Sequence, residues 1–266
     1  MTQPTDRFAF GQNWQSYLKN AGDLHVERAK RALLEFHERH DLKGWAVLDV
    51  GCGSGIHSYA AVALGASQVF SFDYDADSVE ACRRLKARKA PEAGHWHIQQ
   101  GDILAEGFTQ QLSRYDLVYA WGVLHHTGHL WKAVENAARL VKDGGFLHLA
   151  IYNRHWTSPF WKAIKKFYCG SPRWIQNLML AAYAGKDILR LLLKERQNPW
   201  RVIRDYPQSR GMLWWNDLRD WLGGYPYEYA SVAETTGFLG KLGLRLIRCS
   251  PNCETGCSSY LFQRPH

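Results

Sequence analysis

The most constraining feature of this sequence is residues 47–55, which read Val-Leu-Asp-Val-Gly-Cys-Gly-Ser-Gly. A short apolar run leads to glycines at alternate positions, Gly51, Gly53 and Gly55, and a helix-compatible stretch begins at Ile56. This pattern predicts a strand, a tight turn and a helix start, where the backbone can approach a ligand because no Cβ stands in the way. The spacing is G-x-G-x-G and not the G-x-G-x-x-G of dinucleotide sites, so it suits a nucleoside with an amino-acid tail and no pyrophosphate.

Acidic residues follow the next two strand-like runs. The run from Gln68 to Phe72 ends at Asp73, which lies 22 residues beyond Gly51. A carboxylate at this point can accept hydrogen bonds from both hydroxyls of a ribose. The third run, from His95 to Gln100, is followed by Asp102, which can accept a hydrogen bond from an exocyclic adenine amine. The two carboxylates therefore predict where a bound nucleoside lies.

Two more strand-like runs complete the central part of the chain. The fourth spans Tyr115 to Trp121 and is followed by His125 and His126. The fifth spans Gly145 to Tyr152, after a turn at residues 142–145. Ligands of open α/β sheets bind at the carboxyl edge of the strands, so the two histidines are expected near the ligand.

Five ordered motifs carry a resemblance to a known family. They are LDVGCGSG at 48–55, FDYD at 72–75, GDIL at 101–104, YDLVYAWGVLHH at 115–126 and LVKDGGFL at 140–147. Together they resemble the class I S-adenosylmethionine-dependent methyltransferases, in the subgroup similar to the ubiquinone and menaquinone methyltransferases. The resemblance implies an α/β, Rossmann-like fold: a seven-stranded, mostly parallel sheet with helices on both faces and a helical cap insertion. The closing strands are then expected at Leu244–Cys249 and Cys257–Gln263.

The resemblance also implies a cofactor site. S-adenosylmethionine is the expected cofactor. Carried over motif by motif, its expected contacts are Asp49, Gly51, Gly53, Gly55, Asp73, Tyr74, Asp102, Ile103 and Trp121. N-terminal segments in such enzymes often close the site, so Trp14 and Tyr17 are expected to fold over the cofactor.

Three segments are expected along the chain. Residues 1–44 form an N-terminal helical lead, with an amphipathic helix at Asp23–His40 whose apolar positions recur at helical spacing. Residues 45–152 and 229–266 form the S-adenosylmethionine-binding α/β core. Residues 153–228 form a helical cap insertion that binds the acceptor, with a short helix at Asp217–Trp221.

Composition fits a soluble enzyme. Hydrophobic residues make up 46% of the 266 residues and aromatic residues 14%, which is too many for a disordered chain. Residues 1–7 are polar and lack the apolar region of a signal peptide, and no apolar run approaches the roughly 20 residues that a membrane helix needs. The sequence therefore predicts a cytoplasmic protein.

The six cysteines are expected to be free thiols in a reducing compartment. Cys249, Cys253 and Cys257 recur at every fourth position and invite a zinc interpretation. The spacing is not the usual C-x-x-C pair and no fourth ligand is nearby, so no metal is expected.

Positive charge is concentrated in one segment. Residues 151–210 contain 12 lysines or arginines and 3 acidic residues, a net charge of +9 in a chain whose total is +8. A solvated helical face is the commoner origin of such a run. The alternative is a patch for an acidic partner: an anionic acceptor, a membrane surface or nucleic acid. Tryptophans interleave with the charges at Trp156, Trp161, Trp174 and Trp200.

His126 is the first candidate for catalysis. Methyl transfer from a sulfonium needs alignment of donor and acceptor, and a hydroxyl or ammonium acceptor also needs a base, for which histidine is suited. Adjacent side chains point in different directions, so only one of His125 and His126 is expected to face the acceptor. The alternative is a structural role for either histidine.

The cap supplies the second set of candidates. Its aromatic-rich stretch at 214–228 either packs the cap onto the core or forms a lid. In the lid interpretation, Tyr225, Tyr227 and Glu228 contact the acceptor and Arg210 holds an anionic group.

The expected reaction is methyl transfer to a small-molecule or sugar-containing acceptor. A hydroxyl is the first choice of acceptor atom, nitrogen the second and carbon the third. The alternatives are a catalytically inactive binding or regulatory subunit with this fold and, less favoured by the glycine spacing, an NAD-dependent oxidoreductase. The sequence leaves the oligomeric state open.

Overall fold

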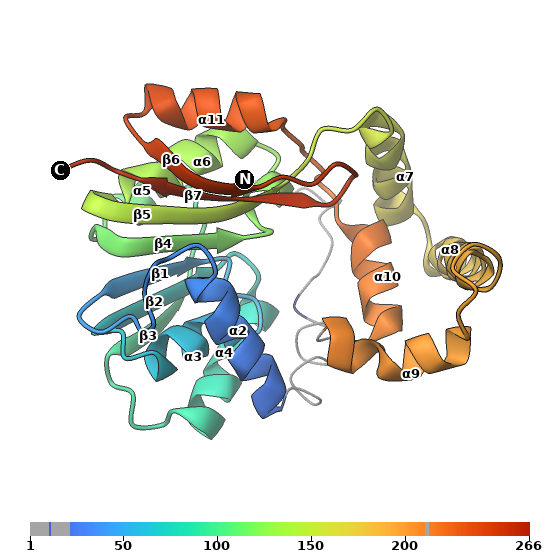
Figure 1. The fold of residues 1–266 in the computed structure, drawn as a ribbon, viewed down its shortest axis with the longest axis horizontal. Coiled ribbons are helices and arrows are strands. Elements are labelled where there is room, and N and C mark those ends of the chain that lie inside the picture. Colours follow the sequence, from blue (N-terminus) through green and yellow to red (C-terminus); the bar gives the residue numbers. More distant parts are fainter. Residues whose placement is uncertain (1–10, 12–21, 211–212) are drawn as a thin grey trace.

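The fold is built on one seven-stranded sheet. A computed structural model describes residues 11, 22–210 and 213–266, and only the backbone of residues 208–210. The strands lie in the order β3-β2-β1-β4-β5-β7-β6, and only β7 runs antiparallel to its neighbours (Figure 1). Their bounds are β1 Ala46–Val50, β2 Gln68–Asp73, β3 Trp96–Gln100, β4 Tyr115–Trp121, β5 Val141–Tyr152, β6 Arg245–Ser250 and β7 Cys257–Gln263. The expected seven-stranded, mostly parallel α/β sheet is confirmed.

Helices cover both faces of the sheet, as Figure 1 shows. One buried cluster joins the sheet to α6 and α11, through residues such as Val134 and Leu239. A second cluster joins the other face to α2, α3 and α4, through Leu33, Ala60 and Leu85. The helix bounds are α2 Asp23–Leu34, α3 Ile56–Ala63, α4 Ala76–Lys89, α5 Glu106–Thr109, α6 Leu130–Arg139 and α11 Val232–Lys241, with a 3₁₀ turn η1 at Leu124–His126. Two apolar faces of one sheet are thus closed by two sets of amphipathic helices.

Four helices stand to one side of the sheet, beyond the carboxyl ends of its parallel strands (Figure 1). They are α7 Ser158–Gly170, α8 Arg173–Leu193, α9 Pro199–Arg210 and α10 Trp214–Gly223. A small apolar cluster of their own, which includes Tyr168, Trp214 and Leu218, lies wholly within residues 161–222. These four helices, together with the turn at residues 224–228 that follows α10, are called the cap below. Their assignment as an acceptor-binding insertion remains a prediction.

Three of the expected elements have wrong bounds. The short helix expected at Asp217–Trp221 begins earlier and ends later, as α10 Trp214–Gly223. In the other two, tertiary packing outweighs local preference. The first helix ends at Leu34 and not at His40, because the chain turns to pack the rings of Phe36 and His37 against β5. The rings of His37 and Phe146 lie 5.1 Å apart, and burial lowers the pKa of His37 to about 4. The fifth strand begins at Val141 and not at Gly145, because Val141 already pairs with Tyr115 before an irregularity in the ladder.

Candidate active site

The glycine turn joins β1 to α3 at the carboxyl edge of the sheet. Gly51, Gly53 and Gly55 all have positive φ, at 68°, 52° and 77°. A Cβ on Gly51 would lie 2.4 Å from Val123, and one on Gly55 would lie 2.4 Å from the Cys82 sulfur. Close packing of the protein against itself therefore requires glycine at Gly51 and Gly55. For Gly53, the expected reason for glycine is the close approach of a ligand.

Asp73 binds the glycine turn from the end of β2. Its two carboxylate oxygens accept hydrogen bonds from the backbone N–H groups of Gly53 and Asp75, each at 2.9 Å. Burial raises the pKa of this carboxyl to about 6. A carboxylate can accept about four hydrogen bonds, so Asp73 retains capacity for ribose hydroxyls. The arrangement fixes an acidic side chain beside the turn, as the sequence predicted.

Asp49 lies inside the fold, behind the turn. Ser58 on α3 donates a hydrogen bond to its carboxylate, Ser71 on β2 donates to Ser58, and Trp96 on β3 donates to Ser71. Only 4% of Asp49 is exposed, and burial raises its pKa to about 7. This geometry supports a role in bracing the turn and not the direct cofactor contact expected from the motif.

The remaining predicted cofactor contacts lie along the same edge. Asp102 is half-buried and accepts a hydrogen bond from the backbone N–H of Leu104 at 2.9 Å. Tyr74 is exposed, whereas Ile103 is buried in the core. Trp121, at the end of β4, is 36% exposed and stacks on Tyr119 with ring centroids 6.1 Å apart. Ile103 therefore offers a ligand no exposed side chain, while Tyr74, Asp102 and Trp121 remain candidates.

His125 is buried and held by backbone on two sides. Its ring nitrogen Nδ1 accepts a hydrogen bond from the Tyr152 N–H at 3.3 Å, and its carbonyl accepts one from the Glu228 N–H at 3.0 Å. Burial, with the nearby His126 and Lys165, holds the pKa of His125 well below its usual range. These contacts favour the structural role that was the alternative for His125, and its catalytic role stays a prediction.

His126 contacts the cap directly. Its Nδ1 lies 2.7 Å from the carbonyl oxygen of Pro226, and a Cβ on Gly224 would lie 2.9 Å from its Cε1. A carbonyl can only accept, so Nδ1 carries the proton of the neutral ring and Nε2 holds the lone pair. Residues 224–228 therefore pack on His126, although the two parts are about a hundred positions apart in the sequence.

The other predicted cap residues differ in burial and in the contacts that they make. Glu228 accepts a hydrogen bond from the Leu130 N–H at 3.0 Å, so its carboxylate caps the first turn of α6. Tyr227 is fully buried and Tyr225 is half-buried beside the same turn. The side chain of Arg210, and the whole of Trp14 and Tyr17, lie outside the described residues. Their expected roles remain predictions.

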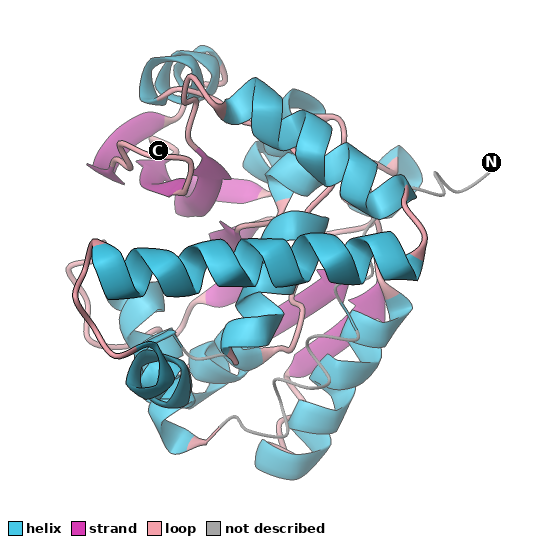
Figure 2. Cartoon of the chain, turned by 90° about the vertical axis from the view of Figure 1, so that its right-hand side faces the viewer, coloured by secondary structure: helices cyan, strands magenta, loops and turns pink. Residues whose placement is uncertain are grey.

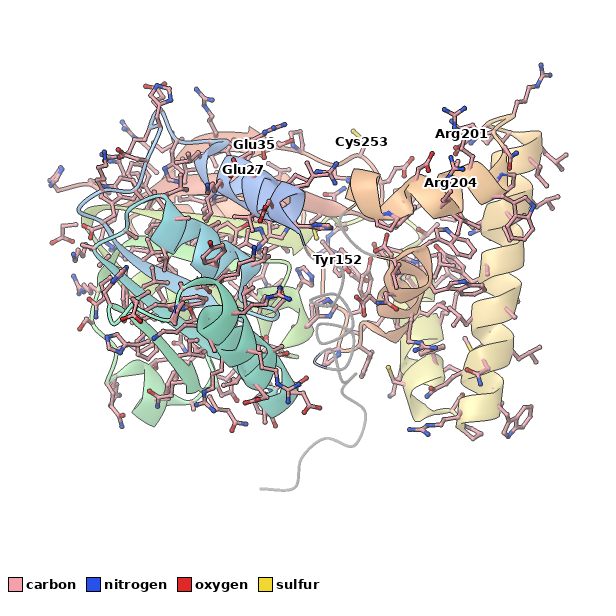
Figure 3. All side chains as sticks on the ribbon, turned by 90° about the horizontal axis from the view of Figure 1, so that it is seen from below. Glu27, Glu35, Tyr152, Arg201, Arg204 and Cys253 are labelled. Atoms are coloured by element: carbon pink, nitrogen blue, oxygen red, sulfur yellow. The ribbon has the colours of Figure 1, made fainter. Side chains whose placement is uncertain are left out.

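Lys165 is a candidate that the sequence interpretation missed. It is fully buried on α7, donates a hydrogen bond to the Trp221 carbonyl, and lies 4.2 Å from the Trp221 ring centroid and 5.0 Å from that of Tyr227. Its Nζ would lie 3.5 Å from a Cβ on Gly224, on the same turn that contacts His126. Burial lowers the pKa of Lys165 to about 7. Figure 3 shows Tyr152, whose ring lies 5.9 Å from this ammonium, between the sheet and the cap.

The described residues offer no obvious metal centre. Among them, no three histidine, cysteine, aspartate or glutamate side chains are grouped so that they could hold a metal ion. The side chains of Cys249, Cys253 and Cys257 are free thiols.

Comparison with known proteins identifies the domain. Residues 48–147 match the family described as "Methyltransferase domain". This segment of the chain is therefore similar to a methyltransferase domain. A ubiquinone biosynthesis O-methyltransferase from Leptothrix cholodnii is 35% identical over 115 residues, which cover 43% of this chain and 47% of that protein. Its counterpart from Glaesserella parasuis is 32% identical over 136 residues, covering 49% of this chain and 55% of that protein.

A solved structure extends the likeness in fold. Magnesium protoporphyrin IX methyltransferase from Synechocystis PCC 6803, with bound SAH, superposes with a TM-score of 0.53 at 16% identity. The match covers 91% of this chain and 84% of that one. The match over residues 48–147 agrees with the expected resemblance, and the superposition confirms the expected fold. The chain spans only about half the length of the curated relatives it matches. The family match ends at residue 147, within β5.

Proposed function

We propose that this protein transfers the methyl group of S-adenosylmethionine to a hydroxyl of a small-molecule acceptor. The observation that carries the proposal is the hydrogen bond from Gly53 N–H to Asp73, which joins the glycine turn to the carboxylate expected to bind the ribose, in a segment that matches a methyltransferase domain. In this reading the turn receives the methionine part, Asp73 the ribose and Asp102 the adenine. Two of the relatives that the chain resembles are O-methyltransferases of ubiquinone biosynthesis, which favours oxygen as the acceptor atom.

The chemistry asked of the protein is alignment and removal of one proton. In the displacement the sulfur–methyl bond breaks while the oxygen–methyl bond forms, and the acceptor hydroxyl loses its proton. His126 is the proposed base, because the Pro226 carbonyl fixes the tautomer whose Nε2 can accept that proton. Packing of the 224–228 turn against His126 would also exclude water from the reacting atoms.

The acceptor is proposed to carry a negative charge. Lys165 holds a buried ammonium beside the turn that contacts His126, and three aromatic rings surround it within 6 Å. An anionic group would stabilise the charged lysine, whose pKa burial lowers to about 7. The basic segment at 151–210 is proposed to face a larger anionic partner, a lipid surface or nucleic acid.

Calorimetry with S-adenosylmethionine and with NAD tests the cofactor. We expect binding of the first and none of the second. Release of the demethylated product in the presence of phenolic and sugar hydroxyl acceptors then tests the reaction. Cofactor binding without turnover on any acceptor would favour a binding subunit, and binding of NAD alone would overturn the proposal.

A further inference from the structure

Helix α8 presents an apolar stripe to solvent along its whole length. At about 3.6 residues per turn, positions 174, 178, 181, 185, 189 and 192 return to within roughly 60° of one direction. The large residues on this stripe are strongly exposed: Trp174 at 69%, Leu178 at 64%, Leu189 at 54% and Leu192 at 49%. Ala181 and Gly185, also exposed, fill the middle of it. Figure 2 shows this long helix lying across the outer side of the cap.

The stripe is not the face by which α8 packs on the cap. Leu180, Ala184 and Leu191 are the buried residues of this helix. Leu180 and Ala184 belong to the cluster with Trp214 and Leu218 of α10. The helix is therefore apolar on two sides, and only one side is used inside the protein. Extended exposed apolar surface of this kind marks an interaction site.

Further exposed aromatic side chains lie on or beside the neighbouring cap helices. Phe160 and Phe167 are 65% and 59% exposed on one side of α7, next to Trp156 at 76%. Trp200, at the start of α9, is 75% exposed. By contrast, the sheet and its covering helices expose few large apolar side chains: Leu24, Tyr74, Trp121 and Ile247. The exposed apolar surface of the described residues is thus concentrated on the cap.

Positive charge accompanies this apolar surface. Lys162, Lys166, Arg173, Lys186 and Lys194 are all exposed on α7, on α8 or at its end. Figure 3 labels Arg201 and Arg204 on α9 of the cap, whereas the labelled acids Glu27 and Glu35 lie on the core. An exposed apolar face and exposed cations on the same helices are typical of helices that lie in the interface of an anionic membrane.

We propose that the outer face of the cap binds the surface of an anionic lipid bilayer, with α8 lying in the plane of the interface. The 21 residues of α8 give a contact about 30 Å long. None of the helices in the described part of the chain is long and apolar enough to cross a membrane, so the contact is peripheral. The basic residues would attract anionic headgroups, and the leucine and tryptophan side chains would enter the headgroup region.

Two other occupants fit less well. A second copy of the chain would bring the same segment of charge +9 against itself. Nucleic acid would satisfy the cations, but phosphates would leave the leucines of the stripe uncovered. The lipid surface alone accounts for both the charge and the apolar stripe. This inference does not depend on methyl transfer, because it uses no residue of the candidate active site.

Co-sedimentation of the full chain with vesicles tests the proposal. We expect binding to vesicles of phosphatidylcholine with phosphatidylglycerol, and much weaker binding to phosphatidylcholine alone. The triple variant Trp174→Ser, Leu178→Ser, Leu189→Ser should weaken binding by at least about tenfold, since each substitution removes an apolar side chain that would be buried in the bilayer interface. Arg173→Glu with Lys194→Glu should weaken binding to the anionic vesicles by a similar factor and leave the residual affinity less sensitive to salt.

Matched controls keep the test decisive. Leu24→Ser replaces an equally exposed leucine on α2 of the core, and Lys43→Glu reverses an exposed lysine there; neither should change vesicle binding. Circular dichroism and S-adenosylmethionine affinity show that each variant is folded. No binding to either vesicle, or binding that the triple variant retains, would overturn the proposal. A dimer in light scattering that the triple variant abolishes would assign the stripe to a second copy, and preferential binding of duplex DNA or RNA would assign the charges to nucleic acid; either result also overturns it.

Discussion

The glycine turn after β1 and the Gly224–Glu228 turn of the cap meet the same edge of the sheet, yet they are assembled differently. At the glycine turn, Gly53 contacts Asp73, which lies 20 residues away along the chain. At the cap turn, Pro226 contacts His126, which lies 100 residues away. The residues of the first site therefore lie close together in the sequence, within short motifs. The residues of the second site come together only when the cap packs on the core.

The largest expected effect is a loss of turnover, and it tests whether the cap turn serves the reaction while the glycine turn serves cofactor binding. His126→Ala should lower turnover by about 10²–10⁴-fold if the ring accepts the acceptor's proton. Cofactor affinity should stay unchanged, because His126 contacts the cap turn and not the glycine turn. Product formation and calorimetry measure the two quantities, with the exposed His129→Ala as the control. A parallel loss of cofactor affinity would show that the two regions are one site and break the comparison.

The second effect lies on the cofactor side. Asp73→Ala removes a charged acceptor, and hydrogen bonds to charged groups contribute roughly 1.5–3 kcal/mol each, so S-adenosylmethionine affinity should fall at least about tenfold. The pKa of Asp73 is raised to about 6. Its charged form is therefore lost as the pH falls through 6, and affinity for the parent protein should fall over the same range. Calorimetry from pH 5 to 8 checks both points.

A matched control for this variant is Asp143→Ala, which removes an exposed carboxylate near the start of β5, at the opposite end of that strand from the candidate site. An Asp73→Ala protein that is folded and binds the cofactor as tightly as the parent would remove Asp73 from the site. The cofactor side would then lose the residue that links its two motifs.

The sequence predicted the glycine turn and the carboxylate beside it, because the residues that form them are neighbours in short motifs. It identified Gly53, Asp73 and the strand ends from local pattern alone. It could not separate Asp49 from the ligand contacts, because the serines and tryptophan that bury it come from three different elements. Motif spacing states which residues are near the turn, but not which way each side chain points.

Lys165 shows why the cap side was harder to predict. A lysine in a basic segment is expected in solvent. One signal in the sequence argued otherwise: Trp161, Lys165 and Tyr168 recur at helical spacing, which places the lysine on the apolar side of α7. Its aromatic neighbours, Tyr152 and Trp221, come from other elements and became visible only in the fold.

The third effect tests whether that lysine belongs to the acceptor site. Lys165→Met keeps an apolar stem and removes the charge, so KM for an anionic acceptor should rise by roughly two- to tenfold. Cofactor affinity should be unchanged. The neighbouring, exposed Lys166→Met is the matched control. Equal KM values for the two variants, with the fold intact, would limit Lys165 to holding the end of α10 through the Trp221 carbonyl.

The smallest effect concerns the support behind the glycine turn. Ser58→Ala removes a hydrogen bond to the buried Asp49 carboxylate and should lower the free energy of unfolding by about 1–2 kcal/mol. The pKa of Asp49 is about 7, raised mainly by burial, and the Ser58 hydrogen bond acts against that rise by favouring the charged form. The loss should therefore be largest above pH 7 and shrink toward pH 5, where Asp49 is protonated in the parent and in the variant.

Thermal unfolding of the parent, of Ser58→Ala and of the exposed Ser113→Ala at pH 5 and pH 8 measures this difference. Cofactor affinity of Ser58→Ala should remain within about twofold of the parent, because bracing a turn that Asp73 and Val123 also hold changes its position little. A large loss of affinity with unchanged stability would place Asp49 in direct contact with the cofactor. The motif would then report the ligand contact after all, and the buried serines would serve to orient that carboxylate toward it.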